Sequence, residues 1–182
     1  MPTADNRPEP PFNILFLCTG NSARSIFAEA LANYPPVGGG KFRAFSAGSR
    51  PRGIVDPAAI EVLQRYQIPV GPNVRSKSWD EFAAEGAPSL HFIITVCDQA
   101  RGEACPLWPG HPITAHWGVP DPAAVISSDE DRRRAFRDVF GVLRRRIERF
   151  AALPLETLTP AELRAQLDAI GREGLLTSSL DR

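Results

Sequence analysis

Short continuous runs of apolar residues recur along this chain, and longer stretches with apolar positions at helical spacing lie between them. Continuous runs of this length are typical of strands covered on both faces, whereas a period of three to four residues is typical of amphipathic helices. Alternation of the two favours a parallel sheet with helices on both faces. We therefore predict a three-layer α/β/α fold with four strands, at residues 13–17, 42–48, 91–96 and 113–117.

Capping residues mark where most of the helices begin. An Asp-Pro pair, two Ser/Thr-x-x-Glu capping boxes and a lone serine each precede apolar positions of helical period. A glycine is expected to end two of these helices. The predicted helices run from Ser22 to Tyr34, from Asp56, from Ser78 to Gly86, from Ser128 to about Ala152, and from Thr159 to Gly171.

The first apolar run leads directly into a cysteine and a short polar loop, Cys18-Thr19-Gly20-Asn21-Ser22-Ala23-Arg24-Ser25. The loop N–H groups and the free amides at the start of the following helix would form a cradle for a tetrahedral oxyanion, and the Arg24 guanidinium would bind two anion oxygens. The same positive field should lower the pKa of Cys18 and make it a nucleophile. Ser25 could donate a hydrogen bond to that thiolate. The alternative is an inert cysteine that packs at a strand end.

Two further groups follow strands of the same predicted sheet. Cys97 ends the third strand, and Asp121 follows the fourth. Because parallel strands present their carboxyl ends at one edge, we expect both groups to lie near Cys18, together with the loop 49–55. Asp121 could act as a general acid or could only cap the short turn that Pro122 begins.

Composition narrows the range of partners. The chain has 182 residues, 43% of them hydrophobic, and its 21 basic side chains balance 21 acidic ones. We expect a disordered tail at residues 1–11 and a single domain at 12–182, with a C-terminal helical extension from about 155. No apolar run has the length of a membrane span, and no signal segment is evident, so we expect a cytoplasmic protein with no membrane partner.

The arginine clusters of the long helix, Arg132–Arg134 and Arg144–Arg146, are interspersed with acidic residues. This spacing predicts a solvated helix face and no nucleic-acid partner. We also expect a monomer. Three cysteines are too few for a secreted disulfide scaffold, so each is expected to be either a buried packing residue or a working thiol.

The segment from Cys18 to Ser25 resembles the phosphate loop of the low-molecular-weight protein tyrosine phosphatase superfamily, which includes both phosphatases and arsenate reductases. The resemblance implies a strand order of 2-1-3-4 and an oxyanion site at Thr19, Gly20, Asn21, Ser22, Ala23, Arg24 and Ser25. It covers residues 13 to about 153. Phosphatases of this superfamily follow the Asp-Pro pair with an aromatic residue, whereas this chain has Ala123, which suits a small inorganic oxyanion better than phosphotyrosine.

Two more cysteines favour the arsenate reductases within the superfamily. Reduction of arsenate to arsenite takes two electrons, which two thiols supply by forming a disulfide, and a third thiol can pass that disulfide outward. The segments around Cys97, Cys105 and residues 116–123 resemble the thioredoxin-coupled arsenate reductases. The resemblance implies that Cys18 attacks the arsenic, that Cys97 attacks Cys18, and that Cys105 resolves the pair. Packing roles for Cys97 and Cys105 stay open, and a zinc site of these two with His111 and His116 is disfavoured by the spacing.

The resemblance departs from the family pattern in two places. Seven residues separate Cys97 from Cys105, where thioredoxin-coupled relatives have six, although Gly102 allows the segment to adapt. Asn21, Glu29 and Ser46 match positions that bind potassium in some relatives, but the acidic partner expected near Ser78 is absent, which argues against the ion. No tightly bound cofactor is expected.

We therefore predict a cytoplasmic arsenate reductase that serves arsenic detoxification, binds arsenate with phosphate or sulfate as analogues, and draws electrons from thioredoxin or from glutathione and glutaredoxin. Two alternatives remain. The first is a low-molecular-weight phosphatase, and the second is a non-catalytic module that binds oxyanions or senses arsenic.

Overall fold

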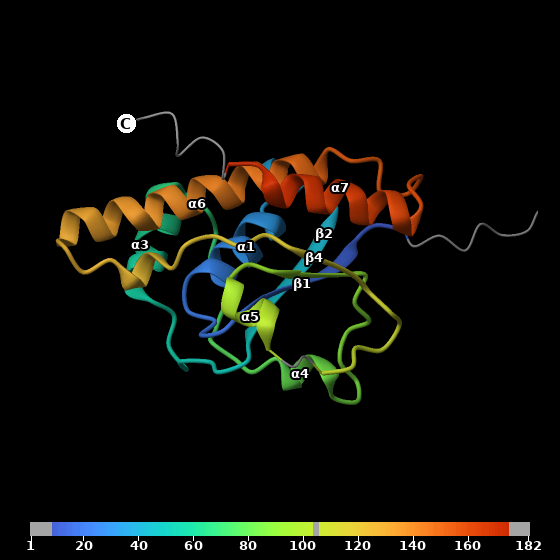
Figure 1. Ribbon diagram of the computed structural model, residues 1–182, viewed down its shortest axis with the longest axis horizontal. Helices are drawn as coiled ribbons and strands as arrows, with labels where there is room; N and C mark the ends of the chain where they lie inside the picture. Colours follow the sequence, from blue (N-terminus) through green and yellow to red (C-terminus); the bar gives the residue numbers. More distant parts are fainter. Residues whose placement is uncertain (1–8, 104–105, 175–182) are drawn as a thin grey trace, which may run out of the picture.

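The sheet has four parallel strands in the order β2-β1-β3-β4, as predicted (Figure 1). The computed structural model describes residues 9–103 and 106–174, so Cys105 and residues 1–8 of the predicted tail lie outside the described residues. The strand bounds are β1 Phe12–Cys18, β2 Phe42–Gly48, β3 Phe92–Thr95 and β4 Ile113–His116. Each lies within one residue of the predicted run or is slightly shorter.

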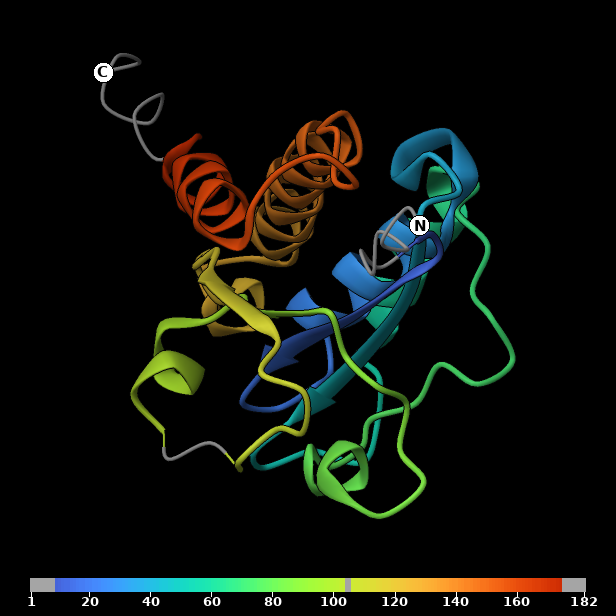
Figure 2. The same cartoon turned by 90° about the vertical axis from the view of Figure 1, so that its right-hand side faces the viewer.

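Helices cover both faces of this sheet, but unequally. The helices are α1 Arg24–Asn33, α2 Pro35–Gly38, α3 Pro57–Arg65, α4 Asp80–Ala83, α5 Asp98–Gly102, α6 Asp129–Ala151 and α7 Pro160–Arg172, with a 3-10 turn, η1, at Pro122–Ala124. The larger core cluster joins the sheet to α1, α3, α6 and α7. Figure 2 shows α6 and α7 on one side of the sheet and α4 on the other. No helix in the described part of the chain is long and apolar enough to cross a membrane.

Side chains of β1 alternate between the two faces, as the period of a strand requires. Ile14 and Phe16 point into the larger cluster, whereas Leu15 and Leu17 join a smaller one that includes Trp79. All four are fully buried. β1 is therefore an inner strand that is covered on both faces.

Three of the four predicted helix caps are present. Asp56 caps α3, Ser128 caps α6, and Thr159 forms a complete capping box at α7. The capping box predicted at Ser78 is wrong. The N-cap position of α4 is Trp79, and Glu81 forms an ion pair with Arg75 instead of reaching back to the helix start.

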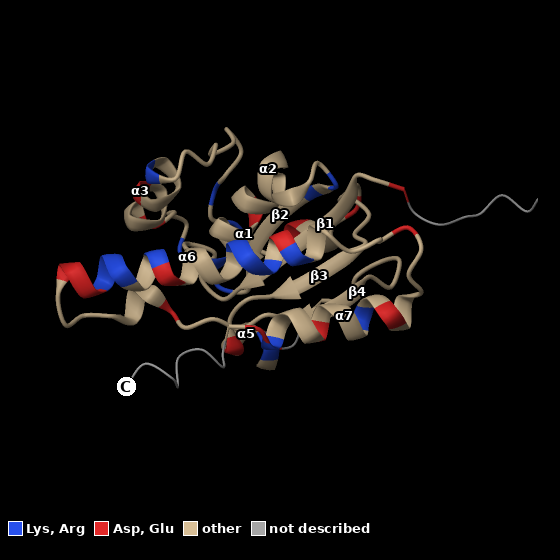
Figure 3. Cartoon of the chain, turned by 90° about the horizontal axis from the view of Figure 1, so that it is seen from above, with Lys and Arg blue, Asp and Glu red and all other residues tan. Residues whose placement is uncertain are grey.

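Two features of the C-terminal helices differ from the simple pattern, both because of close packing. Gly171 is predicted to end the last helix but lies inside α7, and a Cβ there would come within 2.4 Å of the His116 carbonyl oxygen, so this glycine permits close contact with β4. Arg146 is buried at 1% exposure and is an exception to the prediction that the arginines of this helix lie mostly on its solvent face. Its guanidinium donates to the carbonyl oxygens of Trp117 and Glu173, each at 2.9 Å. Charged residues are spread along α6, as the blue and red segments of this helix show in Figure 3.

Candidate active site

The two cysteines that the structure describes lie at the carboxyl ends of neighbouring strands. Leu17 pairs with Thr95 in the register of β1 and β3, so Cys18 and Cys97 follow in adjacent strands at the same edge. Both are reduced and buried, at 3% and 1% exposure. Cys18 and Cys97 therefore lie close together, as predicted.

Hydrogen bonds to the loop after Cys18 fix the direction in which its peptide groups point. The carbonyl oxygens of Thr19, Gly20 and Ser22 point out of the loop. They accept hydrogen bonds from the backbone N–H groups of Arg50, Arg52 and Asp56, each at 2.9 Å. In a trans peptide the N–H points opposite to the carbonyl. The N–H groups of Gly20, Asn21 and Ala23, which follow these carbonyl groups, therefore point into the loop. The Asn21 N–H donates to the Cys18 sulfur. The loop 49–55 lies beside Cys18, as predicted.

The start of α1 adds further positive character. Its N-cap residue, Ala23, has no side chain that could occupy the free N–H groups of the first turn. Arg24 is the first helical residue, and its guanidinium reaches across to the segment after β4. Nη1 donates to the Val119 carbonyl oxygen at 3.3 Å, and Nη2 lies 3.7 Å from Asp121 Oδ2. The cradle, the guanidinium and the carboxylate are thus assembled around Cys18.

The contacts of Asp121 are compatible with both roles considered for it, capping and general acid. Its Oδ1 accepts a hydrogen bond from the Ala123 N–H at 3.0 Å, which caps η1. Its Oδ2 faces Arg24. Capping fixes the carboxyl group beside the Arg24 guanidinium, so the two roles are compatible in one side chain.

The two thiols share their protons unequally. Hydrogen bonds from Cys18, from the Thr19 hydroxyl and from the Ala100 N–H lower the pKa of Cys97 to about 5. Hydrogen bonding to Cys97, together with burial, raises the pKa of Cys18 well above its usual value, despite the nearby charge of Arg24. The lowered pKa predicted for Cys18 is therefore wrong for the pair as it stands in this structure. The hydrogen bonds thus favour a thiolate at Cys97 over one at Cys18.

A buried polar network supports the loop from behind. The Asn21 amide donates to Ser25 Oγ at 2.8 Å and to Ser46 Oγ at 3.0 Å, and the Ser46 hydroxyl donates to Glu29 Oε2 at 2.5 Å. Asn21 itself has a positive φ of 44°, a conformation that asparagine tolerates better than most residues. Ser25 thus accepts a bond from Asn21, and its predicted bond to the Cys18 thiolate stays a prediction.

Several residues near the site were not predicted. Glu103 Oε1 lies 3.4 Å from the Thr19 hydroxyl oxygen, and Lys77 is a buried lysine behind the loop. Neither carries a motif signal, because their burial depends on how distant loops fold together. His116 uses both ring nitrogens, with Thr95 at 2.6 Å and Asp98 at 2.8 Å. Within the described ranges, no group of three or more His, Cys, Asp or Glu side chains is placed to hold a metal ion.

Residues 13–167 match the family described as low molecular weight phosphotyrosine protein phosphatase. A protein of Shouchella clausii named arsenate reductase is 32% identical over 138 residues, which cover 76% of this chain and 94% of that protein. A solved structure described as an arsenate reductase in the phosphate binding state has a TM-score of 0.58 at 26% identity, over 78% of this chain and 97% of that one. The thioredoxin-dependent arsenate reductase of Corynebacterium glutamicum has a TM-score of 0.52 at 22% identity, over 75% of this chain and 60% of that one, and this likeness concerns the fold alone.

Proposed function

The chain belongs to the low molecular weight phosphotyrosine protein phosphatase family, and we propose that it is an arsenate reductase that uses its own thiols as the electron source. The name that curated relatives bear supports the reaction. The observation that carries the proposal is the pair of interacting sulfur atoms, Cys18 and Cys97, at the oxyanion cradle. A phosphatase needs only the first of these thiols.

The first step is attack by the Cys18 sulfur on the arsenic atom of bound arsenate. The inward N–H groups of the loop and the Arg24 guanidinium hold the oxyanion. As Cys18 attacks, its proton passes to the neighbouring Cys97 thiolate. A sulfur–arsenic bond forms, and one arsenate oxygen leaves as water with a proton from Asp121, the candidate general acid.

The second step is the reduction. Cys97 passes its proton to an oxygen of the arsenic group and attacks the Cys18 sulfur, and the sulfur–arsenic bond breaks with its electron pair moving onto arsenic. Arsenic(V) becomes arsenic(III) and leaves as arsenite, while the two thiols become a Cys18–Cys97 disulfide. The hydrogen bond between the two sulfur atoms supports this attack, because it brings the attacking sulfur to the one that it must bond.

The third step regenerates the nucleophile. Cys105 attacks the sulfur of Cys97, which frees Cys18 and leaves a Cys97–Cys105 disulfide for an external reductant. Cys105 lies outside the described residues, so this role rests on the sequence resemblance. Thioredoxin is the proposed reductant, as in the relative from Corynebacterium glutamicum whose name includes it; glutathione with glutaredoxin is the alternative. We place the protein in the cytoplasm as a monomer.

Arsenite release with thioredoxin, thioredoxin reductase and NADPH tests this function. Wild-type protein should release arsenite continuously, and Cys18→Ser should release none and should also lose any hydrolysis of p-nitrophenyl phosphate. Cys97→Ser should stop arsenite release while weak phosphatase activity persists, because only the second attack is removed. Continuous phosphatase turnover without arsenite release by the wild type would instead identify a phosphatase, and the absence of both activities would identify a binding module.

A further inference from the structure

Lys77 is buried directly behind the oxyanion loop, at 7% exposure. Its backbone is fixed on both sides, since its N–H donates to Asn21 Oδ1 at 2.9 Å and its carbonyl oxygen accepts from the Gly48 N–H at 2.9 Å. Its ammonium group donates to the Arg75 carbonyl oxygen at 2.8 Å. A buried ammonium is costly unless an opposite charge is close. The position therefore calls for a nearby carboxylate.

Glu29 is the buried carboxylate of the same network, joined to Asn21 through Ser46, and it is buried to the same degree as Lys77. Burial raises the pKa of Glu29, and the Lys77 ammonium is the strongest of the influences that oppose this rise. Arg75 contributes less, because its guanidinium forms a bidentate pair with Glu81. Lys77 and Glu29 are thus each other's main source of charge compensation.

The residues present do not fit a potassium ion, which the family resemblance implies for some relatives. The side-chain oxygen of Asn21 accepts the Lys77 N–H, and its amide nitrogen donates to Ser25 and Ser46. A potassium ion beside Glu29 would also meet the charge of Lys77. The Lys77 ammonium therefore supplies the positive charge that a potassium ion would supply in such a relative.

We propose that Lys77 is a positioning residue, a built-in cation that favours the ionised form of Glu29 and thereby orients the network that holds the oxyanion loop. An ionised Glu29 can only accept, so the Ser46 hydroxyl must donate to it and offer its lone pair to the Asn21 amide. Asn21 is then locked with its N–H toward Cys18. The inference deepens the proposed oxyanion site, but it does not depend on the thiol cascade, and it predicts a site that needs no added monovalent cation.

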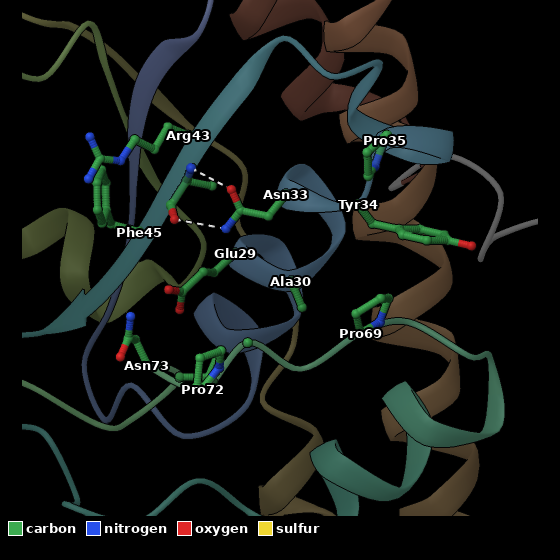
Figure 4. A pocket seen from close by; sticks show the side chains of 13 residues that line it. Glu29, Ala30, Asn33, Tyr34, Pro35, Arg43, Phe45, Pro69, Pro72 and Asn73 are labelled. Atoms are coloured by element: carbon green, nitrogen blue, oxygen red, sulfur yellow. Dashed lines mark hydrogen bonds between the residues drawn. The ribbon is translucent and has the colours of Figure 1, made fainter.

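Glu29 can also be reached from solvent, which makes the idea testable. It lines a cavity of about 440 Å³ between α1, β2 and the loop 69–74. In Figure 4 the Glu29 carboxylate faces the same hollow as Asn73 and Pro72. A small cation could therefore enter and replace a missing ammonium group beside Glu29.

The test is the affinity for inorganic phosphate, measured by calorimetry in potassium chloride and in choline chloride at equal ionic strength. Wild-type affinity should be equal in both salts. Lys77→Met should bind phosphate about tenfold more weakly in choline, a loss of about 1.4 kcal/mol, and potassium should restore part of this affinity. Lys41→Met is the matched control: the Lys41 ammonium bonds to the Leu153 carbonyl, away from the loop, and its loss should change nothing.

A second variant protects the test against simple misfolding. Lys77→Met combined with Glu29→Gln removes both charges and keeps an oxygen acceptor for Ser46, so it should recover phosphate binding without potassium. The proposal is overturned if wild-type affinity rises with potassium, if Lys77→Met binds phosphate as tightly as the wild type, or if the double variant is no better than Lys77→Met. Phosphate binding requires no reductant, so these outcomes are separate from a failure of arsenate reduction.

Discussion

Replacement of Gly48 by alanine tests how tightly the oxyanion loop packs against the end of β2. A Cβ at this position would lie 2.4 Å from the Thr19 carbonyl oxygen and 3.1 Å from the Asn21 nitrogen. Both atoms belong to the loop backbone, so no flexible side chain can yield. β2 cannot withdraw either, because Gly48 is paired with Cys18 in the sheet and is bonded to Lys77.

The loop must therefore move, by at least about 0.6 Å to bring the Thr19 contact to 3.0 Å. Overpacking of this kind costs roughly 1–3 kcal/mol of stability, or about 2–4 °C in Tm per kcal/mol for a chain of this size. Because a misplacement of about 1 Å can cost 10²-fold in rate, we expect Gly48→Ala to lower kcat/KM for arsenate by roughly 10- to 100-fold.

The assay is steady-state arsenite release, with thermal unfolding followed in parallel. Gly141→Ala is the matched control. It makes the same change in α6, where the added Cβ meets only the end of the Arg145 side chain at 3.6 Å. The control should keep wild-type activity and gain up to about 1 kcal/mol of stability, because alanine is the better helix former. Wild-type kcat/KM in a folded Gly48→Ala protein would refute the packing argument.

Three further predictions concern single side chains. Asp121→Asn should slow the first chemical step by roughly 10²–10⁴-fold in single-turnover experiments, the usual size of a general-acid contribution, and a change below about threefold would leave only the capping role. One thiolate should react with iodoacetamide down to a pH near 5, the pKa of Cys97; in Cys97→Ser the pKa of Cys18 should fall below its wild-type value, because the largest cause that raises it is gone. An unchanged Cys18 titration would contradict that cause. Arg146→Met should lower the free energy of urea unfolding by about 2–4 kcal/mol, since it leaves buried carbonyl oxygens unpaired, whereas the exposed Arg145→Met should have little effect.

The features that the sequence predicted well depend on local pattern. The apolar run of β1 and the loop after Cys18 lie in one continuous segment, and parallel strands must end at one edge, so the meeting of Cys18 with Cys97 and Asp121 could be predicted. The order of the strands came from the family resemblance.

The features that the sequence did not predict depend on contacts between distant segments. Arg146 stands next to the exposed Arg145 in the same run of three arginines, and the carbonyl groups beyond β4 make its burial favourable. The sequence gives no sign that Lys77 differs from an ordinary surface lysine, because its interaction with Glu29 depends on the folded loop. The pKa values of the two thiols likewise depend on their mutual contact, which the pattern around Cys18 alone cannot supply.

The central claim is that two thiols of this chain reduce arsenate directly, and disulfide mapping tests it most directly. The variant Cys105→Ser is mixed with one equivalent of arsenate without reductant, alkylated, and digested for mass spectrometry. The account predicts one equivalent of arsenite and a trapped Cys18–Cys97 disulfide, with no disulfide formed when phosphate replaces arsenate. Arsenite release with Cys18 and Cys97 both alkylated, or repeated turnovers of this variant with glutathione and glutaredoxin, would contradict the cascade.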